Sequence, residues 1–179
     1  IIFTLNCTTA LNTVIKGILK QGDHAVISSL EHNAVVRPLE TLKKNKIEYS
    51  VAECAPYDDE QTIENFRKQF KSNTKLVICT HASNVFGIKL PIERIGALCR
   101  LNGILFCVDA AQSAGTADIN LSDSCIDFLC TAGHKGLYGP MGTGLLIINS
   151  ETTPDSLIQG GTGSDSANLN QPEILPDKY

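Results

Sequence analysis

The segment from Thr131 to Gly144 places His134 and Lys135 side by side, just before a stretch rich in glycine. A surface turn would account for this pattern, because glycine and proline interrupt regular structure and most lysines are solvated. A lysine amine in a desolvated pocket has another use, since it loses proton affinity there and can form a Schiff base. The elements around the loop decide between these two interpretations.

Further polar side chains follow other apolar runs of strand length. Each has an ordinary explanation: Asp109 and Thr8 could cap helices, His32 could be a partly buried histidine, and Asn84 could belong to a turn. Ligands of open α/β sheets bind outside the carboxyl ends of the strands, so we expect these side chains to converge at one edge. The expected group is Thr8, His32, Asn84, Asp109, Gln112, His134 and Lys135.

The elements that would position these residues follow from hydrophobic periodicity. Helices are predicted near 8–20, 33–45, 59–71 and 91–102. Most of the remaining apolar runs are continuous, which is typical of parallel strands buried on both faces. The alternating order predicts an α/β fold with three layers, α/β/α, and a mostly parallel seven-stranded sheet. Its strands are expected at 1–5, 24–29, 47–52, 75–80, 104–109, 126–130 and 144–149.

Composition narrows the classes of function. The 179 residues fit one domain, and a net charge of −4 without a basic cluster argues against nucleic-acid binding. No apolar run approaches the roughly 18 residues of a membrane span, and the start lacks the features of a signal peptide. The cysteines are odd in number, lack zinc-site spacing and often lie in apolar runs. They predict reduced core thiols, no metal site and a cytoplasmic protein.

The turn after the first strand suggests an anion site. Cys7, Thr8 and Thr9 would open a helix there, where free N–H groups and the helix dipole favour negative charge. The segment is neither a Walker A loop nor a dinucleotide-binding glycine motif, so a single phosphate is favoured. An aspartate at one strand end and a lysine after the next together suggest pyridoxal phosphate. The lysine would form the Schiff base, and the aspartate would keep the ring nitrogen protonated.

Several longer segments carry a family resemblance: "EHNAVVRPLE", "HASNVFGIKLPIERIG", "ILFCVDAAQSAG", "GHKGLYGPMGTGLLI" and the tail from "LIQGGTGSDS" to "QPEILPDKY". Through them, nearly the whole sequence resembles the class V aminotransferase family of fold-type I pyridoxal-phosphate enzymes, and most closely its cysteine desulfurase-like subgroup. The resemblance implies a cofactor-binding large domain over residues 1–150. Residues 151–179 would form an irregular tail leading toward a C-terminal small domain that this sequence does not include.

The resemblance also implies roles for individual residues. The catalytic residues would be Lys135 as the Schiff-base lysine, Asp109 at the pyridine nitrogen and His32 on the face of the ring. The other implied cofactor contacts are Asn84 and Gln112 near the ring O3′, Cys7, Thr8 and His134 at the phosphate, and Gly161 and Thr162 at the phosphate of a partner subunit. The family forms homodimers, so a homodimer is expected here.

The implied reaction is release of sulfur from L-cysteine to give L-alanine, with a sulfur-acceptor protein as a further partner. Alternatives are a class V aminotransferase, a selenocysteine lyase, or a truncated or interaction domain without activity. Two departures affect the phosphate site: Ala132 stands where members often have serine, and Cys7 replaces a usual alanine. The nucleophilic cysteine and the carboxylate-binding arginine of desulfurases would lie beyond Tyr179, so this segment alone is expected to be inactive.

Overall fold

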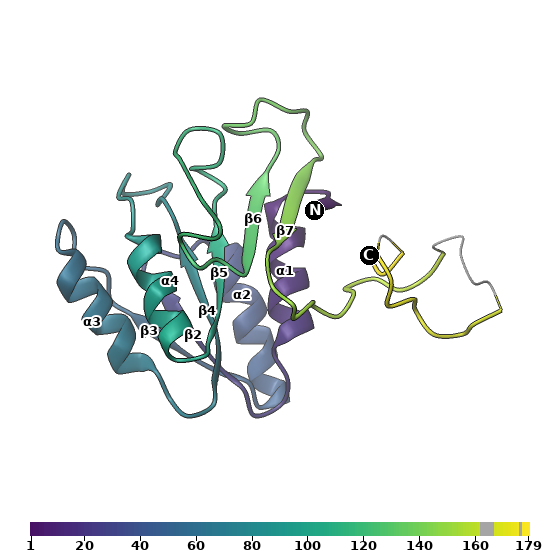
Figure 1. Cartoon of the computed structure of the whole chain (residues 1–179), viewed down its shortest axis with the longest axis horizontal. Coiled ribbons are helices and arrows are strands. Elements are labelled where there is room, and N and C mark those ends of the chain that lie inside the picture. The colour runs from purple at the N-terminus through teal and green to yellow at the C-terminus, as the bar shows by residue number, and fades with distance from the viewer. Residues whose placement is uncertain (162–166, 176) are drawn as a thin grey trace.

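The computed structural model describes residues 1–161, 167–175 and 177–179. Its strands form one seven-stranded sheet in the order β1-β7-β6-β5-β4-β2-β3 (Figure 1). The strands from β2 to β6 pair in parallel, whereas β7 is antiparallel to both β1 and β6. The predicted seven-stranded, mostly parallel sheet is therefore confirmed. The strands are β1 (Ile2–Thr4), β2 (His24–Ser28), β3 (Glu48–Ala52), β4 (Thr74–Thr80), β5 (Leu105–Asp109), β6 (Phe128–Ala132) and β7 (Gly144–Ile148).

Helices cover both faces of this sheet, which confirms the three layers. One apolar cluster joins α1 (Cys7–Ile18) and α2 (Asn33–Leu42) to one face of the sheet. A second cluster joins α3 (Asp59–Gln69) and α4 (Ile92–Leu101) to the opposite face. In Figure 1 the two pairs of helices lie on either side of the central strands. None of the helices in the described ranges is long and apolar enough to cross a membrane.

Burial on both faces explains the continuous apolar runs in the sequence. Along β4, Leu76 and Ile78 belong to the cluster beneath α1 and α2, and Val77 and Cys79 belong to the other. Side chains of a strand alternate between faces, so a central strand needs apolar residues at every position. The predicted core thiols are confirmed as well: five cysteines, including those on β4, β5 and β6, are free and buried, and the other two are half-buried.

The predicted bounds of β6, 126–130, are wrong. Ile126 is buried but precedes the strand, and Cys125 before it has a positive φ of 52°. The Asp127 carboxylate then accepts a hydrogen bond of 2.8 Å from the Phe106 N–H. In a regular sheet a carbonyl of the neighbouring strand would accept that N–H. The strand therefore begins only at Phe128, and it continues to Ala132. The loop that carries Lys135 starts only after Ala132.

Two predicted helix ends are also corrected. Asn6 is the N-cap of α1, because its Oδ1 accepts a 2.8 Å hydrogen bond from the Thr9 N–H. Thr8 lies inside the first turn, so its interpretation as a helix cap is wrong. The helix predicted over 33–45 ends as α2 at Leu42, and the chain tightens into the short 3₁₀ helix η1 (Lys43–Asn45). Lys46 then takes a left-handed conformation, which ends the helical segment.

The described part of 151–179 contains no helix or strand. It contacts the domain through Asp155, whose N–H donates to the Gly17 carbonyl and whose carboxylate pairs with Lys20. Close packing requires the glycine there, because a Cβ at position 17 would lie 2.6 Å from the Asp155 backbone. The division into a large domain and a tail stays a prediction.

Replacing Phe106 by alanine is expected to lower the free energy of unfolding by about 3–5 kcal/mol. Phe106 is fully buried on β5, the strand that ends in Asp109, and its removal leaves a cavity between the sheet and α4. Urea unfolding of the purified protein measures the change. Leu101→Ala serves as a control, because Leu101 is 86% exposed and its loss should change stability by no more than about 0.5 kcal/mol. Equal effects of the two variants would contradict the prediction.

Candidate active site

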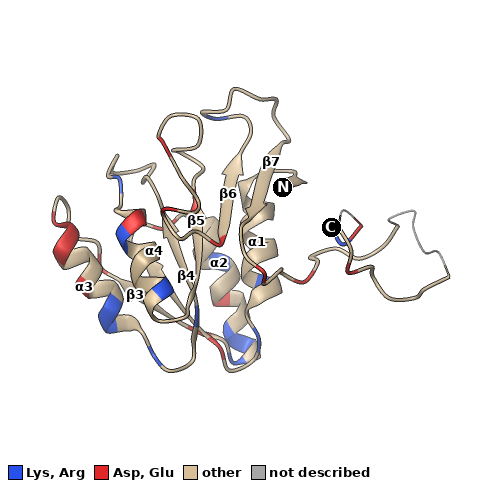
Figure 2. Ribbon diagram, viewed as in Figure 1, with Lys and Arg blue, Asp and Glu red and all other residues tan. Residues whose placement is uncertain are grey.

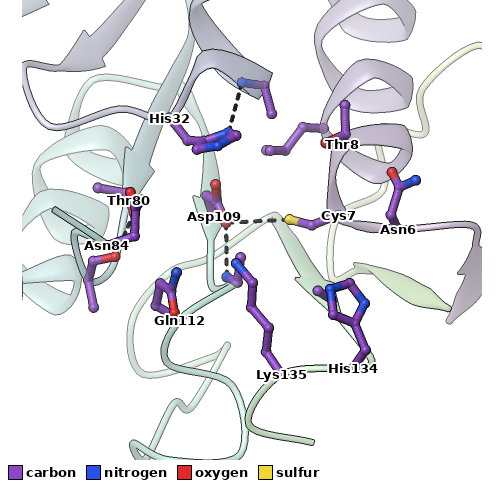
Figure 3. A pocket seen from close by; sticks show the side chains of 15 residues that line it. Asn6, Cys7, Thr8, His32, Thr80, Asn84, Asp109, Gln112, His134 and Lys135 are labelled. Atoms are coloured by element: carbon purple, nitrogen blue, oxygen red, sulfur yellow. Dashed lines mark hydrogen bonds between the residues drawn. The ribbon is translucent and has the colours of Figure 1, made fainter. Parts of the chain in front are cut away.

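A cavity of about 180 Å³ opens at the carboxyl edge of the sheet, between the ends of β4, β5 and β6 and the first turns of α1 and α2. Figure 3 shows its polar side chains, which come from segments far apart in the sequence. Eight of the ten residues predicted for the site line this cavity. They are Cys7, Thr8, His32, Asn84, Asp109, Gln112, His134 and Lys135.

The last residue of β5, Asp109, is only 5% exposed. Its Oδ1 accepts a 2.9 Å hydrogen bond from the Ala111 N–H and a 3.4 Å hydrogen bond from the Cys7 thiol. No helix follows Asp109, because residues 111–116 form turns. The helix-cap interpretation of Asp109 is therefore wrong. The structure instead has a nearly buried carboxylate facing a cavity, with Cys7 on one side and Lys135 below it in Figure 3.

The thiol of Cys7 stays protonated in this environment. Burial raises its pKa, and the neighbouring Asp109 carboxylate raises it further through its charge and the hydrogen bond that it accepts. A thiol with a raised pKa is a poor nucleophile, because the reactive form is the thiolate. Cys7 therefore acts as a hydrogen-bond donor to Asp109, a contact between residues 102 positions apart in the sequence.

The loop after β6 holds Lys135 through close backbone packing. A Cβ at Gly136 would lie 2.5 Å from the Ala114 carbonyl oxygen, so only glycine allows this approach. Gly115 on the opposite turn has a φ of 84° and would bring a Cβ within 2.3 Å of the Gly136 oxygen. The two glycines thus join the lysine loop to the turn that follows Asp109.

Lys135 extends from this loop toward Asp109 (Figure 3). Its side chain lines the cavity, but the residue is exposed to solvent. The structure of this chain therefore does not provide the desolvated pocket that we considered for the amine. The Lys135 side chain nevertheless points into the cavity, whereas a lysine on a simple surface turn would point away into bulk solvent.

His32 is the N-cap of α2 and lies across the cavity from Lys135 (Figure 3). Its Nδ1 accepts a 3.0 Å hydrogen bond from the Ala34 N–H. In the neutral ring the proton must then be on Nε2. The helix cap thus sets both the tautomer and the orientation of the imidazole.

The first turn of α1 forms the end of the cavity where the sequence predicted an anion site. Asn6, Cys7 and Thr8 line it, and His134 lies opposite them (Figure 3). Ala132 also lines the cavity and offers no hydroxyl. Thr131 cannot replace that hydroxyl, because its Oγ1 is buried and donates to the Ala110 carbonyl at 3.3 Å.

Two polar cavity residues were missed by the sequence prediction. Asn6 could have been found, because an asparagine directly before an amphipathic helix is a common N-cap. Thr80 carried no signal beyond its place at the end of a strand, and its hydroxyl donates to the Ala82 carbonyl at 3.1 Å. Of the two remaining predicted residues, Gly161 is exposed and does not line the cavity, and Thr162 lies outside the described residues. The cofactor roles given to the predicted residues stay predictions.

Comparison with known proteins decides the family. A model of the family described as aminotransferase class-V matches residues 1–175. The chain belongs to this family. It is 36% identical over 173 residues to a probable cysteine desulfurase of Pyrococcus abyssi, covering 92% of this chain and 42% of that protein. This class-V chain spans well under half the length of that curated relative.

Solved structures share the fold of this class-V chain. The apo structure of the cysteine desulfurase from Thermococcus onnurineus NA1 matches with a TM-score of 0.79 and 34% identity, over 99% of this chain and 44% of that one. SspA in complex with cysteine matches with a TM-score of 0.75 and 32% identity, over 90% of this chain and 48% of that one. The fold is therefore the large-domain fold of fold-type I enzymes.

Proposed function

We propose that this chain is the cofactor-binding part of a pyridoxal-phosphate enzyme that releases sulfur from L-cysteine and leaves L-alanine. The observation that carries the proposal is the convergence of Lys135, Asp109 and His32 on one cavity beside the first turn of α1. The relatives that are named cysteine desulfurases support the reaction, and the match to SspA in complex with cysteine supports the substrate.

The donor set of the cavity fits pyridoxal phosphate. A nearly buried carboxylate suits a protonated ring nitrogen, and an amine at the opposite side suits an aldehyde. The first turn of α1 supplies free N–H groups and the Thr8 hydroxyl for a phosphate. When bound, the cofactor supplies an electron sink for the bonds around the substrate α-carbon.

Asp109 would hold a proton on the ring nitrogen. Its carboxylate is nearly buried, and a charge-assisted hydrogen bond is strong where water is excluded. The Ala111 N–H and the Cys7 thiol both donate to its Oδ1 and thereby fix the direction of the carboxylate. Its Oδ2 remains for the ring.

Lys135 and His32 would act at the two faces of the cavity. The Lys135 amine can bind the cofactor aldehyde and move a proton at the substrate α-carbon, because its loop places it beside Asp109. His32 would cover the opposite side, with its ring held by the α2 cap, and would exclude water from that face. Its Nε2–H is left to donate to a bound group.

The sulfur step requires a thiolate that the cavity of this chain does not offer. Cys7 is the cavity thiol, and its raised pKa keeps it protonated. In the proposed reaction, a thiolate elsewhere in the full-length protein attacks the substrate sulfur. The C–S bond breaks, an S–S bond forms to give an enzyme persulfide, and the Cβ of the product takes up a proton to give alanine.

A homodimer and a cytoplasmic location are part of the proposal. Phe3, Tyr138 and Met141 are large apolar residues that are more than four-fifths exposed around β1 and the loop between β6 and β7. Figure 2 shows this region almost without charged residues, whereas charges gather on α2, α3 and α4. Exposed apolar surface of this kind supports a subunit contact. Seven free cysteines support a reducing compartment.

A cysteine turnover assay of the full-length protein tests the proposed reaction. With pyridoxal phosphate and a thiol reductant present, L-cysteine should give alanine and sulfide in equal amounts. D-cysteine serves as the control substrate and should give neither product. Formation of a keto acid from L-cysteine, or of alanine from L-selenocysteine alone, would overturn the proposal in favour of a transaminase or a selenocysteine lyase.

A further inference from the structure

A carboxyl group lies buried behind the cavity wall. Glu31 follows β2 and directly precedes His32. Its Oε1 accepts a hydrogen bond from the Ser28 hydroxyl and another, of 2.7 Å, from the Thr80 N–H. Its Oε2 is shielded from solvent and has no hydrogen-bond partner among the described residues. Glu31 itself is not part of the cavity lining.

These bonds connect two strands where their pairing stops. β2 and β4 pair in parallel as far as Ile27 and Ile78, and Thr80 lies beyond the last pair. The Glu31 carboxyl therefore accepts the Thr80 N–H that the β2 backbone no longer reaches. Within the loop itself, the Leu30 N–H donates to the Ser28 hydroxyl at 3.3 Å. The loop from β2 to α2 is thereby fixed to the end of β4.

The environment favours the neutral form of this carboxyl. Burial raises the pKa of Glu31 to about 8, and the negative charge of Asp109 contributes in the same direction. The other titratable groups around it are Cys79 on β4, Cys54 in the segment after β3, and His32 itself. An ionised Glu31 would leave Oε2 as a buried charge without a partner, close to a second carboxylate.

We propose that Glu31 is a positioning residue of the cavity, which as a neutral carboxylic acid ties the loop before α2 to the end of β4. This role rests on the proposed cofactor function, because Glu31 sets the places of His32 and Thr80 in the wall of the proposed cofactor cavity. A neutral Glu31 also places no further negative charge behind the cavity wall near Asp109.

Two substitutions separate the hydrogen bond from the charge. Glu31→Gln keeps the Oε1 acceptor and is neutral at every pH. Glu31→Leu has a similar size and removes the acceptor. Glu53→Leu is the control, because Glu53 is an exposed glutamate just beyond the adjacent strand β3. All three are compared with wild type in the full-length protein.

Protonation and positioning are measured first without cofactor. Infrared spectroscopy at pH 7 should show a protonated-carboxyl band that Glu31→Gln lacks. Hydrogen exchange of the Thr80 and Ala34 amides should speed up at least about tenfold in Glu31→Leu and stay unchanged in Glu31→Gln and Glu53→Leu, because an exchange rate follows the opening equilibrium. The infrared band and the Glu31→Gln data remain informative even where Glu31→Leu does not fold.

The pH dependence of unfolding provides a second measure. An acid whose pKa is raised on folding from 4.5 to about 8 binds its proton more tightly in the folded state, so its contribution to stability falls as the pH rises between these values. The unfolding constant of wild type relative to Glu31→Gln should therefore increase, by up to about tenfold per pH unit in this window. A ratio that does not change with pH overturns the neutral form of Glu31.

Cofactor binding then tests the link to function. The dissociation constant for pyridoxal phosphate should rise at least about tenfold in Glu31→Leu and stay within about threefold of wild type in Glu31→Gln, since preorganised contacts dominate affinity. Equal damage by both variants overturns the proposal. If wild type itself binds no pyridoxal phosphate, the proposed function fails, whereas the infrared and exchange results still decide whether Glu31 is neutral and holds the loop.

Discussion

Replacing Lys135 by alanine in the full-length protein is expected to abolish covalent retention of pyridoxal phosphate and to lower kcat for L-cysteine by at least about 10²–10⁴-fold. The amine is the group at the cavity that can bind an aldehyde, and loss of a positioned proton-transfer group alone has an effect of this size. Folding should be little changed, because the Lys135 side chain is exposed. Absorbance of the bound cofactor and steady-state kinetics measure the two losses.

Chemical trapping identifies the lysine directly. Borohydride reduction of the protein with bound cofactor, followed by peptide mapping, should place the pyridoxyl group on Lys135. Lys89→Ala is a suitable control, since Lys89 is another exposed lysine and does not line the cavity. A label on Lys89 or Lys16 would show that the cavity has been assigned to the wrong lysine.

Replacing Asp109 by asparagine in the full-length protein is expected to lower kcat by about 10²–10³-fold while leaving the cofactor attached to Lys135. The change removes the charge of a nearly buried carboxylate from the proposed ring-nitrogen side, and loss of one preorganised electrostatic contact has this magnitude in other enzymes. The amide oxygen can still accept the hydrogen bond from the Ala111 N–H, so the turn after β5 should persist. Kinetics at saturating cofactor measure the effect.

The thermal midpoint of the cofactor-free protein separates catalysis from folding in this experiment. It should change little in Asp109→Asn, and Asp59→Asn, on the exposed surface of α3, should change neither kcat nor the midpoint. A kcat equal to that of wild type would refute the role of Asp109 at the ring nitrogen. A large loss of stability with unchanged kcat per folded molecule would make Asp109 a structural residue of the turn.

The strands were predictable because their signal is local. A central parallel strand is buried on both faces, so runs such as those of β4 and β5 must be apolar at nearly every position. The same logic placed Asp109 at the end of a strand and Lys135 in the loop after one. The bounds of β6 failed because the apolar Ile126 is buried just before the strand, and the Asp127 side chain, not a backbone carbonyl, accepts the Phe106 N–H.

The sequence by itself determined the layers of the fold and the segments that supply the candidate site, because hydrophobic periodicity, glycine loops and strand-end polar residues are written in neighbouring positions. Only the tertiary structure decided which atoms meet. The Cys7 thiol reaches Asp109 from another element, and the Glu31 carboxyl reaches the Thr80 N–H from another strand. Such contacts depend on the order of the strands in the sheet and on where their pairing ends. Burial then sets the protonation of Cys7 and Glu31, because the cost of a charge depends on atoms that the folded chain brings around it.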